Sequence, residues 1–280
     1  MENKKLNKKE LTTWIFTREG NKFKYTDKII NCFPDHEVYI EPFVGLGSVF
    51  FIKENNTKMN ILNDKSLFIY ELLETLKNED TYNNLINEIQ NTPIYWDILN
   101  NGDTLASKIL VIINSFRASC CSFKLDSTNY KTVILKNLQT IKYHVLDYLN
   151  KNTKILNKNV FDFLKNFDSS IKNKKTLIYC DPPYSLNKGR LKDNKGWNGL
   201  IDLERLIIEL NNTNCNYAIS EHYNLSIYNL FKKNNLDVKI IDKSKGQNSN
   251  KLNENKGKSV EILAINYKTE YNNCMFDFEN

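Results

Sequence analysis

Short apolar runs alternate with helix-like segments along much of this 280-residue chain, and this alternation limits the fold more than any other feature. The strand-like runs are 38–43, 59–64, 176–181, 216–220, 237–241 and 259–267. The helical patterns are 66–77, 200–212 and 225–233. Such alternation is typical of an open, mostly parallel sheet with helices on both faces. The sequence therefore predicts a doubly wound α/β fold.

Residues 78–150 interrupt this alternation. They contain mostly helical patterns and a polar turn, and no parallel-sheet rhythm runs through them. We therefore predict a helical domain, 78–150, inserted into an α/β domain made of residues 1–77 and 151–280.

Composition sets broad limits on partners and location. The net charge of +6 suits a polyanionic partner, although a lysine- and asparagine-rich composition explains it equally well. The longest apolar runs fall far short of the ~20 residues that span a bilayer, and the N-terminus lacks a secretory signal. Six cysteines without paired spacing and three scattered histidines predict no metal site. We expect a cytoplasmic protein with reduced thiols.

A glycine turn follows the first predicted strand in "EPFVGLGSVF". Gly45 and Gly47 would let the backbone approach a ligand, ahead of a helix predicted to start near Ser48. Asp64 ends the next strand, close to the spacing at which a carboxylate meets ribose hydroxyls. Because Phe50 replaces the third glycine of a dinucleotide motif, S-adenosylmethionine (AdoMet) fits better than a pyrophosphate. A plain structural turn could explain either glycine, but not Asp64.

A second feature, "IYCDPPYS", ends an apolar strand abruptly at Asp181. Pro182 and Pro183 make the corner rigid, because proline fixes φ and restricts the residue before it. The alternation also resumes over 153–167, so we take 38–43 as the first strand and 176–181 as the fourth; a doubly wound sheet makes these two neighbours, and ligands bind between their carboxyl ends. The glycine turn and Asp181 should therefore flank one crevice. A strand-ending turn without function is the alternative.

This corner suits an exocyclic amino group, whose lone pair is delocalised into its ring. The Asp181 carboxylate and the Pro182 carbonyl could accept both N–H hydrogens and direct the lone pair at an electrophile. Tyr184 offers a face on which a base could stack. A methyl group could then pass in line from sulfonium to nitrogen, without a metal.

The chain resembles the Dam-type DNA adenine-N6 methyltransferases. "YIEPFVGLGSVFF" and "ILNDKSLFIYEL" resemble their first two motifs, "NKNVFDFL" the acidic third and "IYCDPPY" the catalytic fourth. The resemblance implies a Rossmann-like methyltransferase fold, AdoMet as methyl donor and double-stranded DNA as substrate. The cofactor contacts that it implies are Phe43, Gly45, Gly47, Ser48, Asp64, Asp162 and Asp181. Lys22 matches a further cofactor contact, and Arg18, or alternatively Phe16, stands in for the family's aromatic one.

In this family the region between the second and third motifs reads DNA. By that resemblance Asn114, Arg117 and Lys124 are the expected DNA contacts. Ser119, Cys120 and Cys121 replace the family's usual glycine and asparagine, so we expect a recognition sequence other than the usual GATC. Two lysine-rich loops, 187–199 and 243–258, would clamp phosphates or serve only as solvated linkers. A cognate restriction endonuclease and a monomeric state are further expectations.

Several alternatives remain open from the sequence. Cytosine N4, RNA adenine and a glutamine side chain are other planar amino groups that the same corner could methylate. The glutamine enzymes favour Asn-Pro-Pro-Tyr, so Asp181 favours a base. An inactive methyltransferase retained as a DNA-binding module is the non-enzymatic alternative, against which the intact Gly45, Gly47, Asp64 and Asp181 stand.

Overall fold

The computed structural model describes residues 22, 24–94, 102–114, 128–173, 175–183, 201–244 and 259–269. The chain divides into two compact units, which are described separately below. The helical unit comprises Met1–Lys24, Leu46–Asn55 and Leu67–Ile155. The sheet unit comprises Tyr25–Gly45, Asn56–Ser66 and Leu156–Asn280. Within the described residues, no helix has the length and apolar character needed to cross a membrane.

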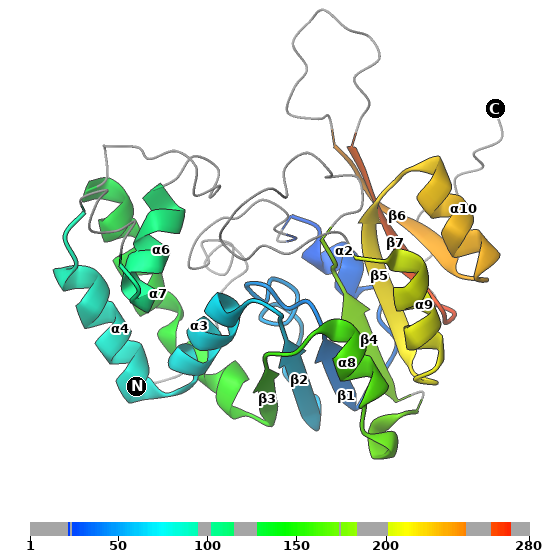
Figure 1. The fold of residues 1–280 in the computed structure, drawn as a ribbon, viewed down its shortest axis with the longest axis horizontal. Coiled ribbons are helices and arrows are strands. Elements are labelled where there is room, and N and C mark those ends of the chain that lie inside the picture. The colour runs from blue at the N-terminus through cyan, green and yellow to red at the C-terminus, as the bar shows by residue number, and fades with distance from the viewer. Residues whose placement is uncertain are drawn as a thin grey trace, which may run out of the picture. The chain divides into compact units, whose positions relative to one another are not determined.

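The sheet has seven strands in the order β3-β2-β1-β4-β5-β7-β6 (Figure 1). The strands are β1 Val38–Glu41, β2 Met59–Asn63, β3 Thr153–Leu156, β4 Thr176–Cys180, β5 Asn216–His222, β6 Asp237–Ser244 and β7 Ser259–Ile265. β1 is parallel to β2 and β4, and β4 is parallel to β5. β7 is antiparallel to both β5 and β6. The predicted doubly wound, mostly parallel α/β fold is confirmed.

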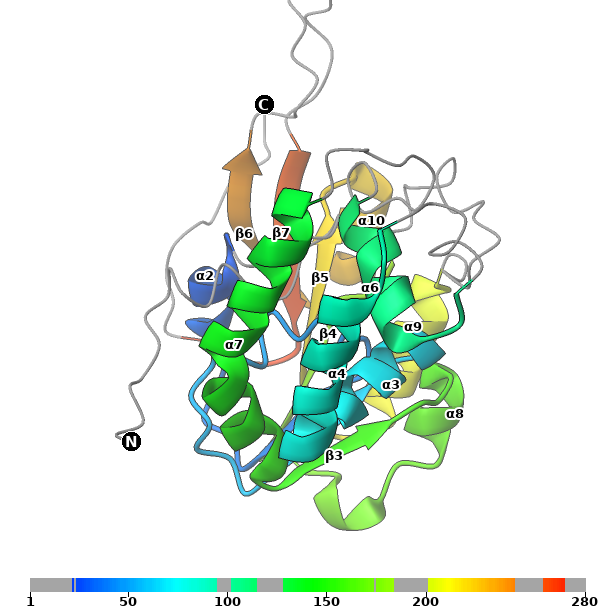
Figure 2. The same ribbon diagram turned by 90° about the vertical axis from the view of Figure 1, so that its left-hand side faces the viewer.

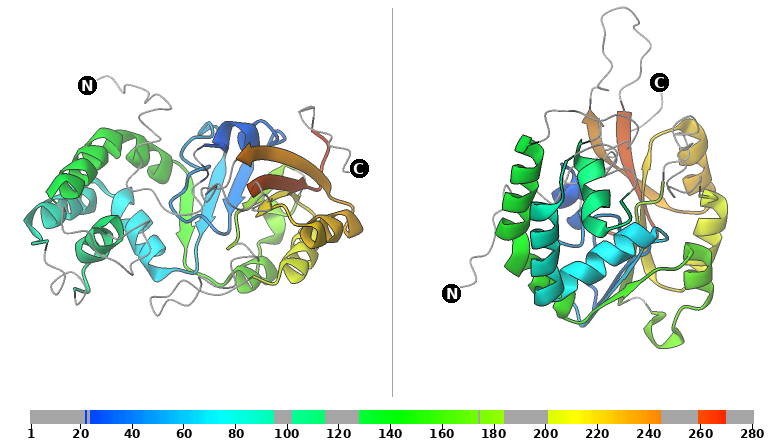
Figure 3. Two further views of the ribbon diagram at one scale, coloured as in Figure 1. Left: turned by 90° about the horizontal axis from the view of Figure 1, so that it is seen from above. Right: turned by 60° about the vertical axis from the view of Figure 1, so that its left-hand side comes forward.

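Alternate residues of the central strands face opposite sides of the sheet. Ile40, Ile178 and Ile219 belong to an apolar cluster. The helices that contribute to this cluster are α8 Val160–Lys165, α9 Leu203–Asn211 and α10 Leu225–Lys233. On the other side, α2 (Thr26–Ile30) leads to Phe33, whose ring lies 5.6 Å from that of Tyr179. Figure 3 shows α2 on the opposite side of the strands from α9 and α10. A short 3-10 helix, η2 (Ser169–Ile171), precedes β4.

Four helices pack together in the helical unit, as Figure 2 shows for α4, α6 and α7. They are α3 Leu67–Lys77, α4 Glu79–Asn91, α6 Leu105–Asn114 and α7 Thr128–Asn150. The buried residues of α3 recur at helical spacing and are Ile69, Leu72, Leu73 and Leu76. The described part of the predicted insertion is therefore helical.

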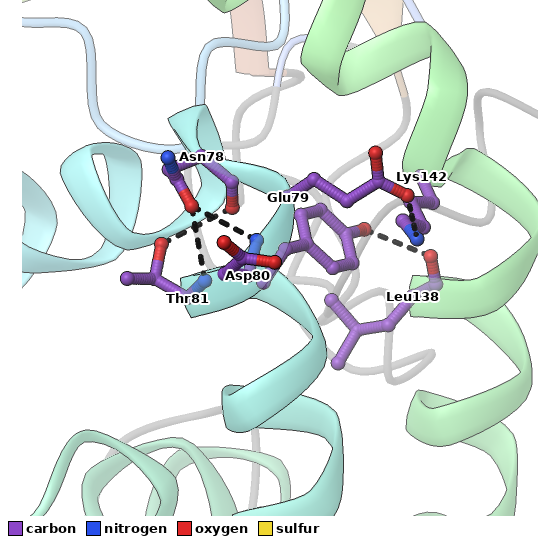
Figure 4. Close-up of polar contacts among 7 residues, drawn as sticks. Asn78, Glu79, Asp80, Thr81, Leu138 and Lys142 are labelled. Atoms are coloured by element: carbon purple, nitrogen blue, oxygen red, sulfur yellow. Dashed lines mark hydrogen bonds and ion pairs between the residues drawn. The ribbon is translucent and has the colours of Figure 1, made fainter.

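α4 begins at a side-chain cap and is tied to α7 by polar contacts (Figure 4). The side chain of Asn78 accepts hydrogen bonds from the N–H groups of Asp80 and Thr81, which would otherwise lack partners within the helix. The Tyr82 hydroxyl donates to the Leu138 carbonyl at 2.8 Å. Because Tyr82 is fully buried, this bond fixes how α4 packs on α7.

The helix predicted to start near Ser48 is wrong. Residues 46–53 form turns instead, with two helix-like bonds, from Phe51 N–H to the Gly47 carbonyl and from Lys53 N–H to the Val49 carbonyl. Val49, Phe50 and Phe51 are all buried, so the segment has no polar face to set against a buried one. Aromatic and β-branched residues also lose side-chain freedom in a helix.

Candidate active site

The carboxyl ends of β1 and β4 lie side by side. The strands pair in parallel with Ile40 opposite Ile178, which confirms the predicted adjacency of the first and fourth sequence strands. Phe43 is three residues after Ile40, and Asp181 is three residues after Ile178. The glycine turn and the proline corner therefore leave the sheet at the same edge. Phe43 is half-buried and packs against the apolar cluster of the sheet unit.

Gly45 and Gly47 both adopt the left-handed conformation that glycine tolerates. Their φ angles are +49° and +69°, a region in which a side chain is strained. A Cβ atom built on Gly45 would have no protein atom within 4 Å. The side of the turn at Gly45 is therefore open to a ligand.

Asp64 holds the glycine turn in place. Its Oδ2 accepts the Gly45 N–H at 2.9 Å, and its Oδ1 accepts the Ser66 N–H at 2.8 Å. Asp64 thus braces the turn through both of its carboxylate oxygens.

Asn63 holds together two loops at this edge of the sheet, and sequence reasoning missed it. Its side-chain amide donates to the Pro42 and Lys158 carbonyls at 3.0 Å each and accepts the Lys158 N–H at 2.9 Å. Its own carbonyl accepts the Val44 N–H. Because Asn63 is only 1% exposed, these bonds tie the loop after β1 to the loop before α8 in a dry environment. The only signal in the sequence is an asparagine in the last position of a buried strand.

Asp162 lies in the first turn of α8, where it is exposed. The helix begins at Asn159, whose side chain accepts the Phe161 N–H at 2.9 Å. Asn63 fixes the adjoining Lys158, so the start of α8 is positioned by the same residue that anchors the loop after β1. An acid at a helix N-terminus is favourable on its own, because it faces the positive end of the helix dipole.

The proline corner is partly covered. Asp181 is half-buried, Pro182 is buried and Pro183 is exposed. Cys180, directly before the corner, is fully buried in the apolar cluster, as expected for a small apolar residue. Burial raises the pKa of its thiol well above the ordinary value.

Tyrosine hydroxyls and carboxylates form a polar layer on the sheet face that points away from α8–α10. The Tyr179 hydroxyl bonds to Ser220 Oγ at 2.9 Å, and the Tyr39 hydroxyl donates to Glu41 Oε2 at 2.9 Å. Burial, and next the charge of Asp181, hold the pKa of Tyr179 well above its usual value. Burial and the nearby Glu41 carboxylate do the same to the pKa of Tyr39. Both side chains therefore remain neutral at physiological pH.

His222, at the carboxyl end of β5, and Glu261 of β7 extend this polar layer. They are opposite one another on β5 and β7, with Nδ1 and Oε2 3.4 Å apart. The carboxylate is 5% exposed and the imidazole 36% exposed. His222 therefore makes a structural contact between neighbouring strands.

The remaining predicted residues belong to the helical unit or lie outside the description. Lys22 is buried in the helical unit, which also holds Gly47 and the half-buried Ser48. Asn114 ends α6, but its side chain is outside the described part of the chain. The predicted residues outside the described part altogether are Arg18, Arg117, Lys124 and Tyr184. Nearly all of both lysine-rich loops is outside it too.

The family model of the D12 class N6 adenine-specific DNA methyltransferases matches residues 19–245. The chain belongs to this family. Its members methylate N6 of adenine in DNA and depend on AdoMet, so the predicted family, enzyme class and DNA substrate are confirmed at this level. A search of curated protein sequences gives no match.

Solved structures with low similarity include two of the rRNA methyltransferase AviRa from Streptomyces viridochromogenes. They are 11% and 10% identical, with TM-scores of 0.44 and 0.46, and the matches cover 94% of both chains. A precorrin-6y C5,15-methyltransferase from Geobacter metallireducens is 9% identical with a TM-score of 0.34, covering 86% of this chain and 85% of its own.

The residues at the carboxyl edge of β1 and β2 fit the nucleoside part of AdoMet. Gly45 has open space beside it, and the Asp64 carboxylate is a hydrogen-bond acceptor, the kind of group that ribose hydroxyls require.

Proposed function

We propose that this member of the D12 class transfers a methyl group from AdoMet to N6 of an adenine flipped out of duplex DNA, with Asp181 and Pro182 as the catalytic acceptors. The observation that carries the proposal is the rigid corner at Asp181, beside the glycine turn braced by Asp64, on neighbouring strands. Family membership supports adenine in DNA as the substrate. The proline corner supports Asp181 and Pro182 as the groups that accept the amino hydrogens.

Methyl transfer to N6 depends on hydrogen-bond acceptors held in fixed positions more than on a strong acid or base. The Asp181 carboxylate and the Pro182 carbonyl would accept the two N6 hydrogens, which draws the nitrogen toward a tetrahedral shape. Because Pro182 and Pro183 restrict the backbone, these acceptors need little reorganisation as charge develops. The Tyr184 ring would stack on the base. The proton released from nitrogen would pass to Asp181 or to water.

AdoMet, when bound, supplies an electrophilic methyl group on its sulfonium. Asp64 would hold the ribose hydroxyls while it braces Gly45, and Phe43, Gly47 and Ser48 would line the same ligand. Lys22 and Arg18 are proposed contacts to the methionine part, and Asp162 a contact to the cofactor or the target base. The chemistry calls for no metal.

DNA recognition is proposed for the helical insertion, residues 78–150. Asn114, Arg117 and Lys124 would reach base edges or phosphates, since arginine can read guanine through two hydrogen bonds. Flipping the base costs a few kcal/mol, which these contacts and the phosphate contacts of the lysine-rich loops must offset. We propose that the enzyme acts as a monomer, with a restriction endonuclease as a possible partner in the cell.

Methyl transfer from labelled AdoMet is the direct test. Purified protein with unmethylated duplex DNA should yield N6-methyladenine, identified after nucleoside digestion, and sequencing of an expressing strain should reveal its sequence context. N4-methylcytosine, or label only in RNA or protein, would replace the proposed substrate. Bound AdoMet without transfer to any of these would favour a binding module.

A further inference from the structure

One face of α7 forms a ladder of hydrogen bonds with the segment that follows the glycine turn. His144 Nε2 lies 2.8 Å from the Phe51 carbonyl oxygen, and the Tyr148 hydroxyl donates to the Lys53 carbonyl at 2.8 Å. The Lys151 ammonium, one residue beyond the end of α7, reaches the Asn55 carbonyl at 3.3 Å. His144 and Tyr148 are four residues apart and share one face of the helix, and the three acceptors are every second residue of the segment. All these groups belong to the helical unit.

Ring packing reinforces this ladder. The His144 and Tyr148 rings lie 4.3 Å apart at 33°, and the edge of Tyr148 meets Phe50 with centroids 5.7 Å apart at 85°. Burial lowers the pKa of His144, against smaller opposing effects of the Phe51 carbonyl and Asp147. The imidazole is therefore neutral at physiological pH, and Nε2 must carry the proton, because its partner is a carbonyl.

The segment depends on these external partners because it does not form a regular helix. Residues 46–53 make only turns, so the carbonyls of Phe51 and Lys53 are not satisfied by a continuous helical ladder. A buried carbonyl without a partner carries a free-energy penalty. The contacts with α7 thus help to hold residues 51–55, which continue the turn that starts at Gly47.

We propose that Tyr148 and His144 are positioning residues, which hold the segment after Gly47 in the conformation that binds AdoMet. The inference rests on the proposed function, because it assigns the cofactor as the ligand of the turn. Neither side chain is proposed to touch AdoMet or the base. Their role is to fix backbone that does, from a helix whose sequence neighbours are the predicted DNA-reading residues.

Tyr148→Phe removes one hydroxyl from the ladder, and Tyr143→Phe is its matched control. Tyr143 lies on the same helix but is 58% exposed, with its ring beside Lys142. We expect Tyr148→Phe to raise the Kd and KM for AdoMet about fivefold, which corresponds to roughly 1 kcal/mol. The KM for DNA and kcat at saturating AdoMet should stay within about twofold of the wild type, as a positioning effect on one ligand requires. Tyr143→Phe should leave every value unchanged.

A second pair of substitutions guards against simple loss of stability. His144→Gln keeps an N–H donor and should preserve AdoMet affinity, whereas His144→Leu should weaken it about as much as Tyr148→Phe. Calorimetric titration with AdoMet alone and thermal unfolding without ligand would accompany the kinetics.

Three outcomes decide the matter. A selective loss of AdoMet affinity in Tyr148→Phe and His144→Leu supports the inference. An equal AdoMet affinity in Tyr148→Phe and Tyr143→Phe, with only the melting temperature lowered, overturns it and leaves the proposed function standing. Wild-type protein that binds no AdoMet overturns both.

Discussion

The glycine turn after β1 and the proline corner after β4 leave neighbouring strands at the same edge of the sheet, yet they are fixed in opposite ways. Gly45 has a backbone that could adopt many conformations, and the Asp64 carboxylate selects one of them from 19 residues away. Pro182 and Pro183 restrict their own backbone covalently. The turn can therefore be released by changing a distant partner, whereas the corner depends on its own residues. In the proposed function, the glycine turn binds the cofactor and is held by a distant side chain, whereas the proline corner holds the reacting amino group and is held by its own residues.

Asp181→Ala should reduce methyl transfer more than any other substitution proposed here, and it changes the proline corner without changing the glycine turn. We expect methyl transfer to fall by at least about a hundredfold, because a fixed acceptor for developing charge is lost. AdoMet binding should remain mostly intact, since the turn is held by other residues. Transfer of labelled methyl groups to DNA and calorimetric titration with AdoMet would measure the two quantities.

Asp237→Ala is the control for this prediction, because Asp237 forms an ion pair with Lys239 away from the corner. If Asp181→Ala lost AdoMet binding as completely as catalysis, the separation between turn and corner would be contradicted.

Asp64→Ala should release the turn and leave the corner intact. Two backbone N–H groups lose their acceptor, so we expect the free energy of unfolding to fall by about 1–3 kcal/mol. AdoMet affinity should fall as well, by an order of magnitude or more. Asp64→Asn keeps one oxygen as acceptor and should lie between the alanine variant and the wild type. Denaturant unfolding and AdoMet titration give both quantities, and equal stability of all three proteins would contradict the bracing role.

Gly45→Ala tests whether the conformation of the glycine turn itself matters for stability and AdoMet binding. The φ of +49° should destabilise the variant by about 1–2 kcal/mol, because the left-handed region is strained for a side chain. The added methyl meets no protein atom, so the structure offers no steric reason for a larger loss. A larger loss of AdoMet affinity than of stability would indicate that the methyl occupies space needed by the ligand. Unchanged affinity would instead place AdoMet elsewhere.

Glu37→Gln should have the smallest effect, since it lies at the opposite end of β1. Hydrogen bonds from Lys175 and then from Lys58 lower the pKa of Glu37 from 4.5 to about 2. A lowered pKa in the folded state contributes stability above the unfolded value of 4.5, and that contribution disappears as the pH falls toward 2. All three side chains reach solvent, so the effect should be modest.

Unfolding midpoints of the wild type and Glu37→Gln should therefore differ by a constant amount above about pH 5 and converge at lower pH. Activity near neutral pH should be the same in both proteins. A clear loss of activity would mean that the two ends of the strand are not independent.

The sequence predicted what depends on local rules and on sheet topology. The pairing of β1 with β4 and the glycine turn between β1 and the following segment follow from strand alternation and glycine chemistry. The helix near Ser48 was wrongly predicted, because a glycine turn after a strand is usually followed by a helix, whereas residues 46–53 form turns here.

The bonds of Asn63 to Lys158 and of Tyr148 to Lys53 each join residues 95 positions apart. Such pairs depend on how distant segments meet, which one sequence without relatives cannot reveal. The roles of Asp162 and Lys22 at the site remain predictions.

Cys180 has a practical consequence for chemical probing of this enzyme. It directly precedes the residue proposed for catalysis, yet it is fully buried in the apolar cluster, and burial raises the pKa of its thiol. Because the thiolate is the species that alkylating agents attack, iodoacetamide should not label this position in the folded protein. Any inactivation of methyl transfer by such reagents would then report on another cysteine, and AdoMet protection against it would not locate the catalytic corner.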